Sequence, residues 1–163
     1  MKKILLLIMV VGLVACSTLT PAEKAERAAK QAAFVANALN DRHYKIDIQM
    51  MYPQRGPAKN VTGTYSLEVK GDSLISYLPY FGRAYQVPYG GGKGLNFIGI
   101  IERYSAVKDA EGRNQIAIEL TNEEDTYLYM LDIFDNGSTT IDVRAKQREP
   151  ISYSGEMVID IKK

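Results

Sequence analysis

The stretch that decides the fold is TYLYMLDIFDNGSTTIDVRA, residues 126–145. Apolar side chains occupy every second position on both sides of its centre, at Tyr127, Tyr129, Leu131 and Ile133 and then at Ile141, Val143 and Ala145. A period of two predicts half-buried strands. Asn136-Gly137 between them fits a two-residue type I′ turn, in which both residues have positive φ. The stretch therefore predicts an antiparallel hairpin with one face in a core.

The same alternation recurs on both sides of this hairpin. It is found at Tyr44–Met50, Tyr65–Val69, Leu74–Leu78, Phe97–Tyr104, Ile116–Leu120 and Ile151–Ile161. About eight short strands joined by hairpins are typical of an antiparallel sandwich or up-and-down barrel. We predict an all-β fold with one N-terminal helix, in which residues 41–163 form a single antiparallel β domain, calycin-like by analogy. The sequence contains no evident repeat or second domain.

An alanine-rich helix is expected over residues 21–40. Thr20 and Glu23 form a capping box around Pro21, and Asn40-Asp41 supplies the stop. Small and apolar residues recur at intervals of three and four along this segment. We expect that stripe to lie against the sheet.

Composition excludes several classes of function. The chain has 163 residues, 20 Lys+Arg against 19 Asp+Glu, one His, one Cys and no Trp. A near-neutral balance removes the electrostatic case for nucleic-acid binding. One Cys forms no internal disulfide, and one His builds no multi-histidine metal site. We expect no cofactor and no metal, and the oligomeric state stays open.

The N-terminus carries a targeting signal. Two lysines precede the apolar run 4–14, which is too short to span a bilayer and is typical of a secretory signal peptide. The run ends in Leu13-Val14-Ala15-Cys16, which resembles the bacterial lipobox. We predict a lipoprotein signal peptide over residues 1–15, lipidation of Cys16 and a tether over residues 16–20. The alternative is an ordinary signal peptide beside an inert Cys.

The residues after Cys16 bear on the destination. Ser17–Thr20 contains no acidic residue, whereas surface-displayed lipoproteins of Bacteroidetes-type bacteria carry acidic residues at this place. That comparison favours export to the outer membrane, facing the periplasm. Removal of residues 1–15 leaves 18 basic against 19 acidic side chains. Lipid rather than charge is therefore expected to hold the protein to the membrane.

Residues 77–97 do not fit a plain meander. They hold six of the fifteen aromatic residues of the chain, among prolines and glycines that interrupt regular pairing. Long connections of this kind are commonly functional. The candidate ligand or partner contacts are Tyr77, Tyr80, Phe81, Arg83, Tyr85, Tyr89 and Lys93. The alternative is an Ω-like loop that plugs one end of a barrel.

This segment also carries a family resemblance. Gly71-Asp72-Ser73-Leu74, the string Tyr77–Tyr85 and Gly90-Gly91 together resemble the family of small Bacteroidetes lipoproteins known as domain of unknown function 4251. The resemblance covers most of the chain after the signal peptide. It implies export and domain boundaries, and it implies no activity.

Two local motifs have alternatives of their own. Gly71-Asp72-Ser73-Leu74 spells the nucleophile motif of GDSL hydrolases, but the only His, His43, lies upstream, and a Ser without a base is a weak nucleophile. Asp72-Ser73-Leu74 resembles the three-residue O-glycosylation site of Bacteroidetes, which makes Ser73 a candidate for modification. Glu123-Glu124-Asp125 is expected to be a solvated hairpin tip rather than a metal site.

The sequence thus predicts a lipid-anchored envelope protein, not an enzyme. We expect a binding or structural module that uses residues 77–97 to contact an envelope protein. The alternative is a carrier of a small apolar or glycan ligand in a barrel cavity lined by tyrosines.

Overall fold

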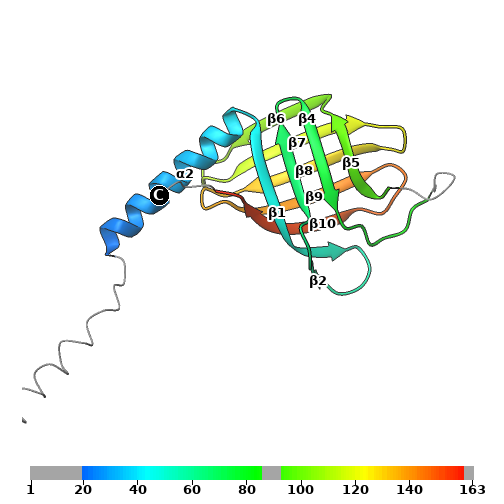
Figure 1. Cartoon of the computed structure of the whole chain (residues 1–163), viewed down its shortest axis with the longest axis horizontal. Coiled ribbons are helices and arrows are strands. Elements are labelled where there is room, and N and C mark those ends of the chain that lie inside the picture. Colours follow the sequence, from blue (N-terminus) through cyan, green and yellow to red (C-terminus); the bar gives the residue numbers. More distant parts are fainter. Residues whose placement is uncertain (1–19, 86–92, 160–163) are drawn as a thin grey trace, which may run out of the picture.

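The computed structural model describes residues 20–85 and 93–159. In that part of the chain a single helix, α2 (Pro21–Asn40), precedes a series of strands (Figure 1). The strands are β1 (His43–Pro53), β2 (Lys59–Asn60), β3 (Ser66–Lys70), β4 (Ser73–Leu78), β5 (Leu95–Ile100), β6 (Arg103–Lys108), β7 (Asn114–Thr121), β8 (Thr126–Ile133), β9 (Ser138–Ala145) and β10 (Ile151–Met157). The predictions for residues 1–15, Cys16 and Tyr89 fall outside the described residues.

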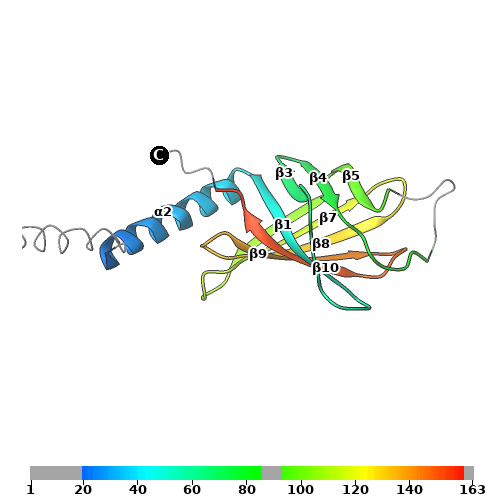
Figure 2. The ribbon, with the colours of Figure 1, turned by 60° about the horizontal axis from the view of Figure 1, so that its bottom comes forward.

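The strands form one antiparallel sheet curled into a half-barrel (Figures 1 and 2). Neighbours follow the order β5-β4-β3-β1-β10-β9-β8-β7-β6, and the short β2 pairs with β1 beside this path. The path joins two sequential runs, β1 to β5 and β6 to β10, through the pairing of β1 with β10, so that β5 and β6 lie at its two edges. The predicted fold class, an N-terminal helix followed by an antiparallel meander, is confirmed.

A bend at Ile101-Glu102 joins the two edges of the sheet. The Ile101 N–H donates to the Asp72 carbonyl (2.8 Å), and the next N–H, of Glu102, donates to the Glu119 carbonyl (2.9 Å). Hydrogen bonding therefore switches from the β4 side to the β7 side within one residue. The single strand expected at Phe97–Tyr104 is divided here into β5 and β6, since consecutive amides point to opposite neighbours.

The inward faces of the strands form one apolar core. The predicted inward residues of β8, among them Tyr127 and Tyr129, are buried, and those of β9 include the buried Ile141 and Val143. Ile46, Leu67 and further strand residues complete the same cluster. The core therefore follows the period-two pattern of the sequence.

The β8–β9 hairpin forms as expected, but with a different turn. Gly137 has φ +82°, whereas Asn136 is not among the residues with positive φ, so the type I′ prediction is wrong. The Gly137 N–H donates to the Phe134 carbonyl (2.8 Å), and the Phe134 N–H donates to the Ser138 carbonyl (2.9 Å). This pattern is a type I turn followed by a glycine bulge. Gly137 is therefore the only residue of this turn with a left-handed backbone conformation.

Helix α2 has the predicted ends and a different packing. The capping box at Thr20 and Glu23 is present, and Asp41 ends the helix. Its buried residues are Val35 and Leu39, while residues 20–30 are exposed, so the expected contact of the early alanine stripe with the sheet is wrong. Alanine buries too little surface to hold the first turns down. The helix therefore projects from one end of the half-barrel (Figures 1 and 2). Within the described residues, no helix is both long and apolar enough to cross a membrane.

Gly155 in β10 provides a test of the packing. Its strand meets β1 where the β1 register shifts between Ile48 and Met50, and a Cβ at Gly155 would run into the carbonyl oxygen of Asp47. Because that oxygen belongs to backbone on a paired strand, it cannot move aside cheaply. We expect Gly155→Ala to lower the free energy of unfolding by about 3 kcal/mol, the upper end for overpacking.

Urea denaturation checks this prediction. Ser105→Ala is the control, because Ser105 is exposed on β6, and a surface change of this kind costs less than about 0.5 kcal/mol. Equal stability of the two variants would contradict the proposed close approach.

Candidate functional site

The first part of the aromatic segment is tied to the barrel end away from α2 (Figure 1). After β4, the backbone runs beside the connection between β9 and β10. The Tyr85 N–H donates to the Gln147 carbonyl (2.7 Å), and the Glu149 N–H donates to the Arg83 carbonyl (2.9 Å). Between them Ala84 and Arg148 form an isolated antiparallel bridge. Residues 83–85 are therefore held like a short strand.

Arg148 lies at the centre of this end of the barrel. Its side chain is only 6% exposed. Nε lies 3.4 Å from Oδ2 of Asp125, Nη2 lies 3.4 Å from Oε2 of Glu124, and Nη1 donates to the Gly94 carbonyl (2.7 Å). The guanidinium also lies over the ring of Tyr80, 5.5 Å from its centroid. One side chain thus joins the β7–β8 turn to the residue that precedes β5.

Asp125 anchors this arginine from the β7–β8 turn. Its carboxylate is fully buried and accepts hydrogen bonds from the backbone N–H groups of Thr126, Lys146 and Gln147. Glu124 is half-buried, and only Glu123 is exposed. The expectation of a solvated hairpin tip is therefore wrong for two of its three residues, because Arg148 and backbone donors replace water.

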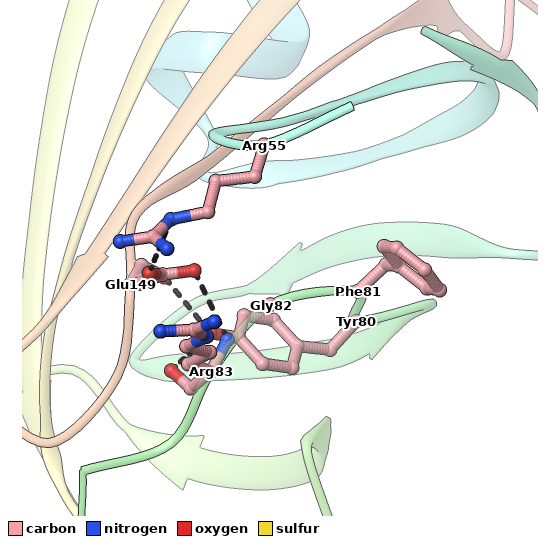
Figure 3. A pocket seen from close by; sticks show the side chains of 6 residues that line it. All are labelled: Arg55, Tyr80, Phe81, Gly82, Arg83 and Glu149. Atoms are coloured by element: carbon pink, nitrogen blue, oxygen red, sulfur yellow. Dashed lines mark hydrogen bonds and ion pairs between the residues drawn. The ribbon is translucent and has the colours of Figure 1, made fainter. Parts of the chain in front are cut away.

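A pocket of about 320 Å³ opens next to this network (Figure 3). It is lined by Arg55, Tyr80, Phe81, Gly82, Arg83 and Glu149. Glu149 is buried at the pocket floor. Its Oε1 lies 3.1 Å from Nε of Arg55, and its Oε2 accepts from the Arg83 N–H at 3.1 Å. The Tyr80 hydroxyl is within donor range of the carbonyls of Glu149 (3.0 Å) and Arg83 (3.1 Å). The side chains of Tyr80 and Glu149 are thus both fixed by hydrogen bonds to backbone groups.

Gly82 is required by this arrangement. A Cβ at this position would lie 2.6 Å from the hydroxyl oxygen of Tyr80. Any side chain there would displace the tyrosine from its two carbonyl partners.

The predicted aromatic residues separate into two groups. Tyr80 is half-buried against Arg148, whereas Phe81 is 52% exposed and Tyr85 is 65% exposed. Tyr77 is also exposed, with its ring stacked on Tyr65 at a centroid distance of 5.0 Å. The segment therefore packs Tyr80 against Arg148 and leaves the other three rings exposed.

The polar candidates also separate. Arg83 lines the pocket, whereas Lys93 lines another groove, beside β5 and the β7–β8 turn. The Lys93 N–H donates to Oε1 of Glu124 (3.1 Å). Ser73 opens β4 and is half-buried, and Leu74 after it is fully buried. The glycosylation prediction for Ser73 stays a prediction.

Sequence reasoning missed the charged residues of the site. Arg148 and Glu149 precede Pro150 between two alternating stretches and were not singled out, and Arg55 lies in the connection after β1. Lys59 was missed as well, although its Nζ lies 3.4 Å from the ring centroid of Phe81. Two adjacent opposite charges next to a proline between two apolar strands were the available signal.

The tyrosine hydroxyls around the site stay protonated at neutral pH. Burial raises the pKa of Tyr80 above its usual value, and burial raises the pKa of Tyr129 and Tyr153 much further. The Tyr153 hydroxyl donates to the Pro79 carbonyl (2.7 Å), which fixes the start of the aromatic segment. Among the described residues, no three His, Cys, Asp or Glu side chains gather as a metal site.

The fold and site define a small, mostly β half-barrel protein whose aromatic segment is fastened by an arginine-carboxylate network. The chain belongs to the family described as Domain of unknown function (DUF4251), whose sequence model matches residues 26–157. The crystal structure of a DUF4251 family protein from Bacteroides eggerthii DSM 20697, at 1.95 Å resolution, is similar in fold, with a TM-score of 0.61 and 14% sequence identity. The match covers 80% of this chain and 88% of that one. No curated protein matches the sequence.

The Arg148 network makes a testable contribution to stability. Arg148→Met keeps an unbranched, largely apolar stem, removes the guanidinium and leaves the buried carboxylate of Asp125 without its cation. Removal of one partner from a buried ion pair costs about 3–5 kcal/mol, and we expect a loss of that size in urea denaturation.

Arg103→Gln is the matched control. Arg103 pairs with Glu119 on the surface of β6 and β7 and is largely exposed, so its loss costs less than about 1 kcal/mol. A loss for Arg148→Met no greater than for the control would contradict a structural role of the network.

Proposed function

We propose that this protein is a lipid-anchored envelope protein that binds a partner protein through its barrel end. The contact surface, here called the aromatic-basic face, is formed by Tyr77, Phe81, Arg83, Tyr85, Arg55 and Lys59. The observation that carries the proposal is the exposure of Phe81 and Tyr85 on a backbone that is fixed by hydrogen bonds. Aromatic and arginine side chains are enriched at the centres of protein interfaces.

A fixed backbone strengthens this interpretation. A surface that is already ordered loses little conformational entropy when a partner binds. Hydrogen bonds to Gln147 and Glu149 hold the segment that displays Phe81, Arg83 and Tyr85. The exposed rings are thus presented in a preorganised arrangement.

Anchoring at Cys16 fits the position of this face. Helix α2 begins at Pro21, soon after the predicted lipidation site, and its 20 residues give a length of about 30 Å. The aromatic-basic face lies at the barrel end away from α2 (Figure 1). A lipid at Cys16 would therefore leave the face directed away from the membrane, where it meets other envelope proteins.

A small-ligand carrier is the second candidate function. The pocket of about 320 Å³ beside Tyr80 and Phe81 favours it, since this volume is at the lower end for ligand sites. Apolar side chains form a core cluster on the concave face of the sheet. A carrier would consequently hold its ligand at the barrel end.

Photo-crosslinking in cells tests the partner proposal. A photoreactive amino acid at Tyr85 or Phe81 is expected to give one discrete adduct band, because both side chains lie on the face. Phe134 is the matched control, an exposed aromatic residue in the β8–β9 turn. That turn lies near α2, whose Gln31 side chain donates to the Asn136 carbonyl. The same adducts from all three positions, or none from Tyr85 and Phe81, would overturn the proposal.

Mass spectrometry of the full chain tests the anchor. We expect a mature protein that begins at Cys16 and carries acyl chains, and a Cys16→Ser variant that lacks both the cleavage and the lipid. An unmodified Cys16 in the wild-type protein would contradict the anchor. The same spectrum would also reveal the added mass of a glycan on Ser73, and the Ser73→Ala variant is the control for it.

A native mass spectrum tests the carrier alternative, because a small ligand that stays bound adds its mass to that of the protein.

A further inference from the structure

The pocket of the aromatic-basic face carries an uncompensated positive charge. Arg55 and Arg83 lie on either side of Glu149 (Figure 3). Two guanidinium groups and one carboxylate leave one net positive charge, and Lys59 adds another beside Phe81. A ligand with a single negative charge would neutralise the three charged residues that line the pocket, Arg55, Arg83 and Glu149.

The free hydrogen-bonding capacity of the pocket consists mainly of donors. Arg55 uses Nε for Glu149, and the two terminal nitrogens of a guanidinium carry four more N–H groups. The carboxylate oxygens of Glu149 already have Arg55 and the Arg83 N–H as partners. The Tyr80 hydroxyl lies close to backbone carbonyls. An incoming acceptor group therefore finds more free partners than an incoming donor does.

Glu149 orients one of these donors. Its carboxylate is 4% exposed, whereas Arg55, which comes from the connection between β1 and β2, is 66% exposed. A buried acceptor at the pocket floor limits where the exposed arginine can point. The planar guanidinium is thereby held ready for a planar anion, which it recognises with two parallel hydrogen bonds.

We propose that this pocket binds one carboxylate group, held between the side chains of Arg55 and Arg83. The inference rests on the proposed function, because it names the chemistry recognised by the same face. A carboxylate matches the single net charge of the three charged residues that line the pocket, Arg55, Arg83 and Glu149, whereas a phosphate dianion would meet twice the repulsion from Glu149. The rings of Phe81 and Tyr80 provide an apolar wall for the body that carries the group. The carboxylate belongs either to a free small-molecule acid, about as large as a single ring, or to a side chain or terminus of the protein partner.

Calorimetric titration of the full-length protein in detergent tests the free acid. The probes are benzoate and D-glucuronate, each with a neutral counterpart, benzyl alcohol and D-glucose. We expect each acid to bind about tenfold more tightly than its counterpart, and added salt to weaken binding. Arg83→Gln is expected to lower the affinity about tenfold, and Arg103→Gln is the control on β6.

Arg83→Gln is the decisive variant, because the contact of Glu149 with residue 83 is made by the backbone N–H and survives the substitution. Arg55→Gln is a second variant, although it leaves Glu149 with one partner fewer. Measurable binding that is equal for acids and neutral counterparts would overturn the inference, as would measurable acid binding that is unchanged in Arg83→Gln.

Crosslinking from Tyr85 in the Arg83→Gln background separates the two sources of the carboxylate. Without acid binding by the wild-type protein, loss of the adduct assigns the carboxylate to the partner and supports the inference. An unchanged adduct without acid binding overturns the inference and leaves the proposed function standing. Absence of the adduct in the wild-type protein overturns the proposed function itself.

Discussion

The buried guanidinium of Arg148 is the constraint on which this end of the barrel depends. It is held by Asp125, whose carboxylate also fixes the backbone of the β9–β10 connection, and it reaches the carbonyl of Gly94. Its neighbour Glu149 holds the backbone N–H of Arg83. Two adjacent residues therefore hold both described ends of the aromatic segment. The position of the aromatic segment therefore follows from two adjacent charged residues, Arg148 and Glu149, in the connection between β9 and β10.

Such a network contributes more to specificity than to stability. Burial of ion pairs costs desolvation energy that their attraction only partly offsets, so an apolar replacement of the whole cluster could be equally stable. An apolar cluster, however, would not select the Gly94 carbonyl or the Arg83 N–H as partners. We infer that the charges are used to fix backbone positions, which is what a preorganised surface requires.

The sequence predicted the parts of the fold that depend on local patterns. Alternation located the β8–β9 hairpin, and the capping box located the start of α2. The bend at Ile101-Glu102 was missed because alternation says nothing about which neighbour each amide meets. The partnership of Asp125 with Arg148 was missed because 23 residues separate them. Long-range charge pairing and changes of strand partner require the three-dimensional arrangement.

The described part of the aromatic segment has two faces, one packed against the barrel end and one exposed to solvent. Tyr80 and Phe81 are adjacent, yet the first packs beside Arg148 while the second lies in solvent under the ammonium group of Lys59. Adjacent residues share the backbone between them, so contacts that hold one residue also restrain the next. The hydrogen bonds that Tyr80 makes at the barrel end therefore also fix the place of Phe81. The packing of Tyr80 at the barrel end and the exposure of the Phe81 ring thus depend on the same few contacts.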